Sequence, residues 1–93
     1  MPVDLIEVPA HAPGVMSRLV DGEMVLVHPA QGKIRVLNRV GSRLWELADG
    51  LRSVDEMART VATEYGVDLD RARSDALAFC TDLVERGVLA TAR

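Results

Sequence analysis

The dipeptide Asp21-Gly22 lies between two short apolar runs, VMSRLV before it and EMVLVH after it. Both central residues of a tight two-residue turn need a positive φ angle, which Asp and Gly adopt at a lower cost than most residues. Such a dipeptide between apolar runs is the strongest local signal for an antiparallel hairpin. The pattern therefore predicts two paired strands, with Leu19 opposite Met24.

A third strand is predicted at residues 33–37, after a four-residue turn at 29–32. Its sequence, KIRVL, contains two β-branched residues and no proline, so every residue keeps a backbone N–H donor. If the turn holds no bulge, Val27 lies opposite Ile34. The three strands then form an antiparallel meander in which strand 33–37 lies at one edge.

The predicted register sorts the side chains of this sheet onto two faces. We expect the core to lie against the face that carries Met16, Val20, Val25, Val27, Ile34 and Val36. The opposite face carries Leu19, Met24, Leu26 and Leu37 among Ser17, Lys33 and Arg35. Because this second face is unusually apolar for a solvated surface, we expect the N-terminal segment or a partner to cover part of it.

Three helices are expected after the sheet, and each has its own capping signal. Asn38 is a typical N-cap residue for the first helix, and Asp49-Gly50 marks the end of that helix. Ser53 and Glu56 form the pattern of a capping box at the start of the second helix. An apolar residue every three or four positions then continues to Gly66, which ends the second helix.

The third and longest helix is expected from a cap at Asp68 or Asp70 to about Arg86. Its predicted buried stripe consists of Leu69, Ala72, Ala76, Cys80 and Leu83. Cys80 falls inside this stripe, so we interpret it as a small buried hydrophobic residue and not as a nucleophile. Three strands followed by three helices are typical of an α+β, winged-helix-like domain, which we place at residues 15–89.

The two ends of the chain are expected to carry less regular structure than this domain. Residues 1–14 contain three prolines and no sustained period, which predicts a flexible N-terminal arm. Part of this arm could attach to the domain as a strand through Leu5, Ile6 and Val8. His11 lies in this arm without a second potential metal ligand nearby, so we expect its imidazole to be solvated. Residues 90–93 are predicted to be a frayed tail.

Charge and cysteine content exclude several classes of protein. The net charge of −3 and the pI of about 5.2 argue against binding to nucleic acid. The single cysteine excludes an internal disulfide and a cysteine-rich zinc cluster, and it suits a reducing cytoplasm. No stretch has the pattern of a signal peptide or the roughly 20 apolar residues of a membrane helix. We therefore expect a cytoplasmic domain with no nucleic-acid or membrane partner.

Patterns of catalytic residues are not found in the sequence. It has no Gly-rich phosphate loop, no set of His, Cys and Asp at metal-ligand spacing, and no nucleophile motif. The acidic residues of the third helix alternate with arginines, which is typical of ion pairing on a solvated face. We expect no catalytic residue, no metal and no cofactor, and thus a protein that is not an enzyme.

From Glu23 onward, the order of these signals resembles the PqqD family. The resembling features are a strand–turn–strand unit ending at Leu37-Asn38, then Gly41, Leu44-Trp45, Asp49-Gly50, the capped Ser53 helix, Tyr65-Gly66-Val67, and Asp75, Phe79 and Leu83 in the last helix. The resemblance extends over about residues 15–89. Members of this family are small peptide chaperones, also called RiPP recognition elements, of pathways that make and modify ribosomal peptides.

The resemblance implies a non-catalytic domain that binds the leader segment of a precursor peptide. Such a domain presents the peptide to a modifying enzyme, such as a radical SAM protein, a leader peptidase or a cyclase, in a pyrroloquinoline-quinone-like, lasso or radical-SAM pathway. In the family, the leader adds as a strand to the third strand and lies in a cleft against the third helix. The residues implied for this site are Lys33, Ile34, Arg35, Val36, Leu37, Arg71, Asp75, Ala78 and Phe79.

The physical properties of strand 33–37 allow such docking. The last strand of a meander has one neighbour, so its outer N–H and C=O groups are available to an added strand. Lys33 and Arg35 would then be placed to meet acidic side chains of a leader, although charges on an edge strand also deter edge-to-edge aggregation. The spacing does not decide which margin of the third helix faces the strand. We favour the margin of Asp75 and Phe79 over that of Leu77.

Two other classes of function fit parts of the same sequence. A winged-helix DNA-binding regulator would share the architecture, but the third helix exposes acidic residues that repel phosphate. A docking subunit of a larger enzyme could use the apolar face around Leu19, Met24 and Leu26. The exposed strand edge and the apolar face also invite a homodimer, so the oligomeric state stays open.

Overall fold

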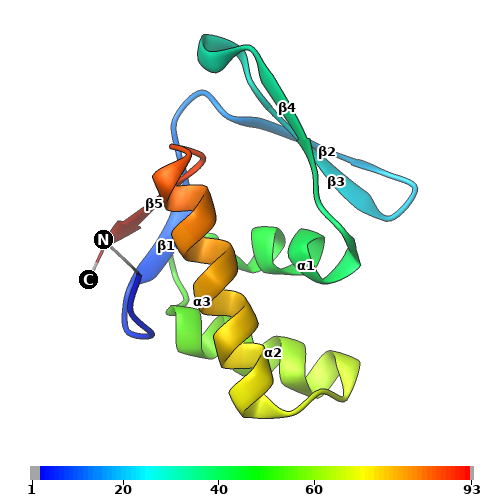
Figure 1. Ribbon diagram of the computed structural model, residues 1–93, viewed down its shortest axis with the longest axis vertical. Coiled ribbons are helices and arrows are strands. Elements are labelled where there is room, and N and C mark those ends of the chain that lie inside the picture. Colours follow the sequence, from blue (N-terminus) through cyan, green and yellow to red (C-terminus); the bar gives the residue numbers. More distant parts are fainter. Residues whose placement is uncertain (1–2, 93) are drawn as a thin grey trace.

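The computed structural model describes residues 3–92 of the chain. Its elements are strands β1 (Val8–His11), β2 (Met16–Val20) and β3 (Glu23–His28), a 3₁₀ turn (Pro29–Gln31), strand β4 (Lys33–Val36), helices α1 (Arg39–Leu47), α2 (Val54–Tyr65) and α3 (Leu69–Glu85), and strand β5 (Leu89–Ala92). Strands β2, β3 and β4 form one antiparallel sheet in that order. The sheet stands at one end of the molecule, α2 lies at the other, and α1 lies between them (Figure 1). The predicted α+β order of three strands followed by three helices is confirmed.

The first hairpin turns at the dipeptide that predicted it. Asp21 and Gly22 have φ angles of 50° and 83°, as a two-residue hairpin turn requires. The register follows from the turn, and Leu19 lies opposite Met24 as expected. The predicted pairing of β3 with β4 is confirmed as well. Local turn chemistry therefore determines the alignment of all three strands.

All three helices begin at predicted capping residues. The side chain of Asn38 accepts a hydrogen bond from a backbone N–H in the first turn of α1. Ser53 and Glu56 form both hydrogen bonds of the capping box at α2. Of the two predicted caps of α3, Asp68 is the one that accepts a backbone hydrogen bond. These caps set where each helix starts and so how the chain turns between helices.

The sheet packs on the core through the face opposite to the predicted one. Met24 and Leu26 are only 7% and 2% exposed and lie in one hydrophobic cluster with Leu44 of α1. Ile34 and Val36, which were expected in the core, are 70% and 61% exposed. The rest of that face is exposed or half-buried: Met16, Val20, Val25 and Val27. The prediction was wrong because both faces are apolar, and strand periodicity does not state which face the helices cover.

Ser42 of α1 fastens the helix to the end of the β3–β4 ladder. Its hydroxyl accepts a hydrogen bond from the N–H of Met24 at 2.7 Å and donates one to the carbonyl of Leu37 at 3.1 Å. The serine is 4% exposed, so water does not readily replace these bonds. The hydroxyl therefore bridges two backbone groups where β4 leaves the sheet.

Replacing Ser42 with alanine is expected to lower the free energy of unfolding by about 1–3 kcal/mol, because the buried N–H of Met24 loses its acceptor. Urea denaturation followed by circular dichroism measures this loss. The matched control is Ser74→Ala on the exposed side of α3, for which a change below about 0.5 kcal/mol is expected. Equal effects of the two substitutions would contradict the bridging role of Ser42.

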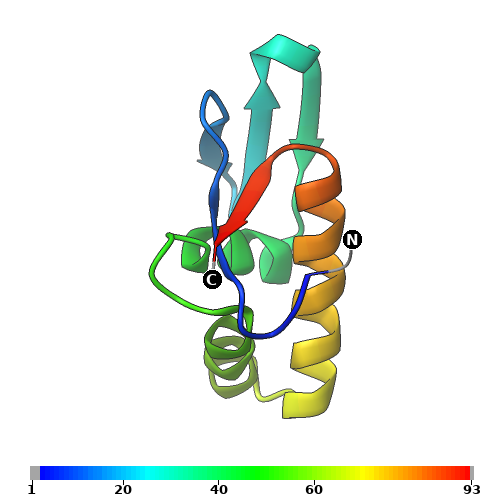
Figure 2. The same ribbon diagram turned by 90° about the vertical axis from the view of Figure 1, so that its left-hand side faces the viewer.

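The two ends of the chain pair with each other. Strands β1 and β5 form an antiparallel pair, which Figure 2 shows in blue and red. Pro9 of β1 is fully buried, and its carbonyl accepts a hydrogen bond from Gly50 at 2.9 Å. The expectation of a flexible arm is therefore wrong for β1, and the expectation of a frayed tail is wrong for β5. Met1, Pro2 and Arg93 lie outside the described residues. A pairing between opposite ends of the chain leaves no local pattern, so the prolines and the lack of a sustained period suggested a loose arm.

Candidate functional site

Strand β4 is an edge strand, because its one neighbour in the described part of the sheet is β3. The N–H of Leu37, just after β4, donates to the carbonyl of Met24 on β3 at 2.8 Å. Backbone groups of successive residues in an antiparallel strand point to opposite sides, so those of Arg35 point toward β3. Those of Ile34 and Val36 then point away from β3. The outer edge of β4 thus presents the N–H and C=O groups of two residues to an added strand.

The side chains of β4 alternate across the sheet in the same way. Ile34 and Val36 project from the outer face, where they are largely exposed. Lys33 and Arg35 project from the inner face, and Arg35 is half-buried there. One short strand therefore combines apolar side chains on one face, basic side chains on the other, and available backbone groups along its edge.

The margin of α3 that carries Phe79 faces the end of β4. A Cβ atom placed on Gly41, at the start of α1, would lie 3.5 Å from both Leu37 and the ring of Phe79. The opposite margin is covered, since Thr81 accepts a hydrogen bond from the N–H of Val3 at 3.1 Å. Figure 2 shows α3 and β4 on the same side of the molecule, with β2 at the other edge of the sheet. The helix therefore turns its Phe79 margin toward the strand.

A cavity of about 340 Å³ lies between the sheet and the C-terminal end of α3. Its lining residues are Leu26, His28, Gln31, Lys33, Arg35, Glu85, Arg86 and Val88. Arg86 is tied to Asp82 by an ion pair of 2.8 Å. In residues 3–92, neither Lys33 nor Arg35 has a carboxylate within ion-pair distance. The cavity is therefore predominantly basic.

The structure brings together some of the predicted site residues but not all of them. Phe79 lies beside the end of β4, and the two basic residues of β4 line the cavity. Arg71 and Asp75 form an exposed ion pair of 3.8 Å in the half of α3 that points away from the sheet (Figure 1). Ala78 is exposed. A role of these residues in peptide contact stays a prediction.

Sequence reasoning missed the contribution of the 3₁₀ turn and of the end of α3 to the cavity. His28, Gln31, Glu85, Arg86 and Val88 all line it. Nothing in their spacing marks them, because more than fifty residues separate the turn from the end of α3. Only the packing of the helix beside the sheet brings them together.

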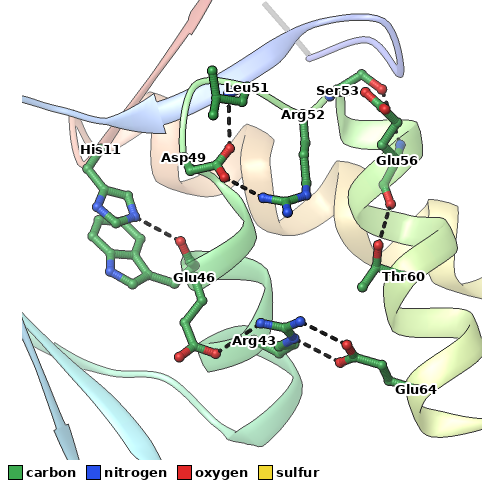
Figure 3. A network of polar contacts seen from close by, with 11 residues as sticks. His11, Arg43, Glu46, Asp49, Leu51, Arg52, Ser53, Glu56, Thr60 and Glu64 are labelled. Atoms are coloured by element: carbon green, nitrogen blue, oxygen red, sulfur yellow. Dashed lines mark hydrogen bonds and ion pairs between the residues drawn. The ribbon is translucent and has the colours of Figure 1, made fainter.

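The charged residues around α1 and α2 form a structural network (Figure 3). Arg43 makes two hydrogen bonds of 2.8 Å with Glu64. Hydrogen bonding to the guanidinium holds the pKa of Glu64 below its usual range. Asp49 pairs with Arg52 at the end of α1. The Arg43–Glu64 contact joins α1 to α2, and the Asp49–Arg52 contact lies in the segment between the two helices.

Cys80 was weighed as a nucleophile and His11 as a metal ligand, and the surroundings of both residues favour a structural role. Burial raises the pKa of the Cys80 thiol to about 12, so the thiol is protonated at neutral pH. The prediction that Cys80 is a buried hydrophobic residue is confirmed, since it is 0% exposed. His11 is exposed, as expected, and one face of its ring stacks on Trp45 with centroids 3.7 Å apart. The sequence does not predict this contact, because Trp45 lies 34 positions away from His11.

The described residues contain no cluster of three His, Cys, Asp or Glu side chains that could hold a metal ion. Within residues 3–92, no helix combines the length and the apolar character needed to cross a bilayer.

The sequence matches the family model described as coenzyme PQQ synthesis protein D (PqqD), over residues 23–89. No curated protein matches the sequence. The family match covers β3, β4, the three helices and the start of β5, and thus includes the strand edge, the Phe79 margin and all the residues that line the cavity.

Several solved structures have a similar fold. TbiB1 in complex with the TbiA(beta) leader peptide is 30% identical, with a TM-score of 0.79 over 86% of this chain and 93% of that chain. A lasso peptide synthetase B1 complexed with its leader peptide has a TM-score of 0.80 at 24% identity, over 89% and 98% of the two chains. The PqqD truncation of Methylobacterium extorquens PqqCD, described as a stand-alone RiPP recognition element, is 25% identical with a TM-score of 0.74, over 89% and 88%.

Proposed function

Because this chain belongs to the PqqD family, we propose that it binds the leader segment of a ribosomally made precursor peptide and catalyses no reaction itself. The observation that carries the proposal is the outer edge of β4, where Ile34 and Val36 direct their backbone groups away from β3. The similarity to TbiB1, whose structure contains a leader peptide, supports the same function.

The proposed binding mode is strand addition. The leader would pair with the outer edge of β4 through main-chain hydrogen bonds, which give affinity without requiring a particular sequence. Its side chains on the inner face would enter the space between β4 and α3, where Phe79 provides an apolar contact at one end. The basic cavity lies at the other end. Selectivity would therefore come from the residues of this space, and affinity largely from the backbone of β4.

We further propose a modifying enzyme as the second partner, in a pyrroloquinoline-quinone-like, lasso or radical-SAM pathway. The outer face of the sheet supports this, because Met16, Val20, Ile34 and Val36 are between 47% and 70% exposed and contiguous apolar surface is typical of interaction sites. The free, buried thiol of Cys80 fits a reducing compartment such as the cytoplasm. A dimer in size-exclusion chromatography that Ile34→Ser converts to a monomer would assign this face to a second copy instead.

The proposal is tested with a short precursor peptide, which we expect to be encoded near the gene of this chain. We expect the leader half of that peptide to bind with a micromolar or lower Kd in isothermal titration calorimetry, and the core half not to bind. A scrambled leader is the control, because it has the same composition without the pattern of side chains. Equal affinity for the leader and the scrambled peptide would contradict recognition of a leader.

A further inference from the structure

We infer that the cavity between β4 and the end of α3 is a subsite for an acidic side chain, Asp or Glu, of the bound peptide. The inference rests on the proposed function and names a chemical requirement of the peptide. It is carried by the composition of the cavity, the absence of counter-ions for two of its cations, and its position beside the outer edge of β4.

The cavity is basic in a protein that is acidic as a whole. Lys33, Arg35 and Arg86 line it together with a single carboxylate, that of Glu85, whereas the chain carries a net charge of −3. Arg86 already pairs with Asp82. The positive potential therefore comes mainly from the two basic residues of β4.

Arg35 has the strongest requirement for an anion. It is half-buried on the inner face of the sheet, and no acidic partner of Arg35 or Lys33 is present among residues 3–92. A partly desolvated guanidinium gains more from a carboxylate than a fully exposed one, because the effective dielectric constant around it is lower. A carboxylate entering the cavity would meet a donor that is already positioned on a strand.

The pleat of the sheet brings a peptide carboxylate to this place. Lys33 and Arg35 lie on the inner face of β4, and Ile34 between them directs its backbone groups outward. A strand added along this edge turns every second side chain toward the same inner face. A residue opposite this part of β4 would therefore direct its side chain toward both cations, with room in a cavity of about 340 Å³.

The test uses a phage-displayed library of random 20-residue peptides selected on the wild-type chain. We expect Asp or Glu at one fixed position of the selected peptides, and a synthetic peptide with that residue changed to Asn or Gln to bind about tenfold more weakly. Lys33→Met and Arg35→Met should remove this preference, so that the acidic and amide peptides bind equally. Combining the change in the peptide with Lys33→Met or Arg35→Met forms a double-mutant cycle. This cycle isolates the interaction between the acidic peptide residue and each basic side chain.

Arg18→Met is the matched control, because Arg18 lies exposed on β2 opposite Val25, on the outer face of the same sheet. It removes one positive charge without touching the cavity and should leave the preference for an acid unchanged. An equal effect of Arg18→Met would show that only the overall charge matters, and would overturn the subsite. Selected peptides that show no preference for Asp or Glu, but whose binding is weakened by Val36→Pro, would overturn the subsite and leave the proposed function standing. A library that yields no binder would contradict the proposed function and the subsite together.

Discussion

Replacing Val36 with proline weakens leader binding by an expected 10- to 100-fold, on the order of 1.5–3 kcal/mol, while the fold is retained. The substitution removes an N–H that points away from β3, so no hydrogen bond of the existing sheet is lost. It also places the proline ring where the backbone of an added strand would lie. Isothermal titration calorimetry with the leader half of the precursor measures the effect, and circular dichroism verifies the fold.

The control for this variant is proline at the other edge of the same sheet. In a hairpin with a two-residue turn, the residues next to the turn form a hydrogen-bonded pair, so Leu19 of β2 also points its N–H outward. Leu19→Pro therefore makes an equivalent change on the edge that lies away from α3. We expect it to leave the Kd within about twofold of the wild type, because small changes at a distance from a binding site are usually near neutral.

Unchanged binding by a folded Val36→Pro variant would rule out strand addition at β4. Equal losses in Val36→Pro and Leu19→Pro would instead point to a general loosening of the sheet. Comparing the two variants thus distinguishes specific docking at β4 from a general loss of sheet stability.

Replacing Trp45 with alanine is the change with the largest expected effect on stability, a loss of about 3–5 kcal/mol. Trp45 is 1% exposed and lies in the core cluster. A domain of this size typically has a total stability of about 5–15 kcal/mol, so roughly a fifth or more of it would be lost. Urea denaturation followed by far-ultraviolet circular dichroism is the measurement, because the chain has no second tryptophan for fluorescence.

A more conservative variant separates packing from polarity at this position. The indole N–H of Trp45 has no hydrogen-bond partner among the described residues, so Trp45→Phe removes a buried unsatisfied donor as well as part of the ring. We therefore expect Trp45→Phe to cost much less than Trp45→Ala. His11→Ala, which removes the stacked ring and the contact of its Nε2 atom with the carbonyl of Trp45, should cost about 0.5–1.5 kcal/mol. If Trp45→Phe lowers the free energy of unfolding as much as Trp45→Ala does, the role of Trp45 is not simply to fill the core with an aromatic ring.

The face of the sheet that packs on the core decides where the basic side chains of β4 point. With the predicted orientation, Lys33 and Arg35 would point to solvent and Ile34 to the core. In the structure the orientation is reversed, and the basic residues line a cavity beside α3. The peptide-binding residues proposed on β4 are the same in both cases, but their roles differ. The backbone role of Ile34 and Val36 needs only the register, whereas the role of Arg35 needs the correct face.

The periodicity of α3 does not decide which margin of its buried stripe faces β4. The three-four spacing of Ala72, Ala76 and Cys80 predicts which stripe of the helix is buried, and all three are buried. It leaves two margins equivalent, because a stripe is symmetric about its centre. The contact between Phe79 and the start of α1 decides between them, and that contact depends on where α1 leaves the sheet.

The sequence by itself determined the features that depend on neighbouring residues: the Asp21-Gly22 hairpin with its register, the caps at Asn38 and Ser53, and the outward donors of a proline-free edge strand. These features arise from the φ preferences and hydrogen bonds of a few adjacent residues, so they are legible without the fold. The tertiary structure alone decided which face of the sheet is buried, the pairing of β1 with β5, and the meeting of the 3₁₀ turn with the end of α3. Each of these depends on packing between segments far apart in the chain, where several arrangements bury similar apolar area and local pattern does not distinguish them.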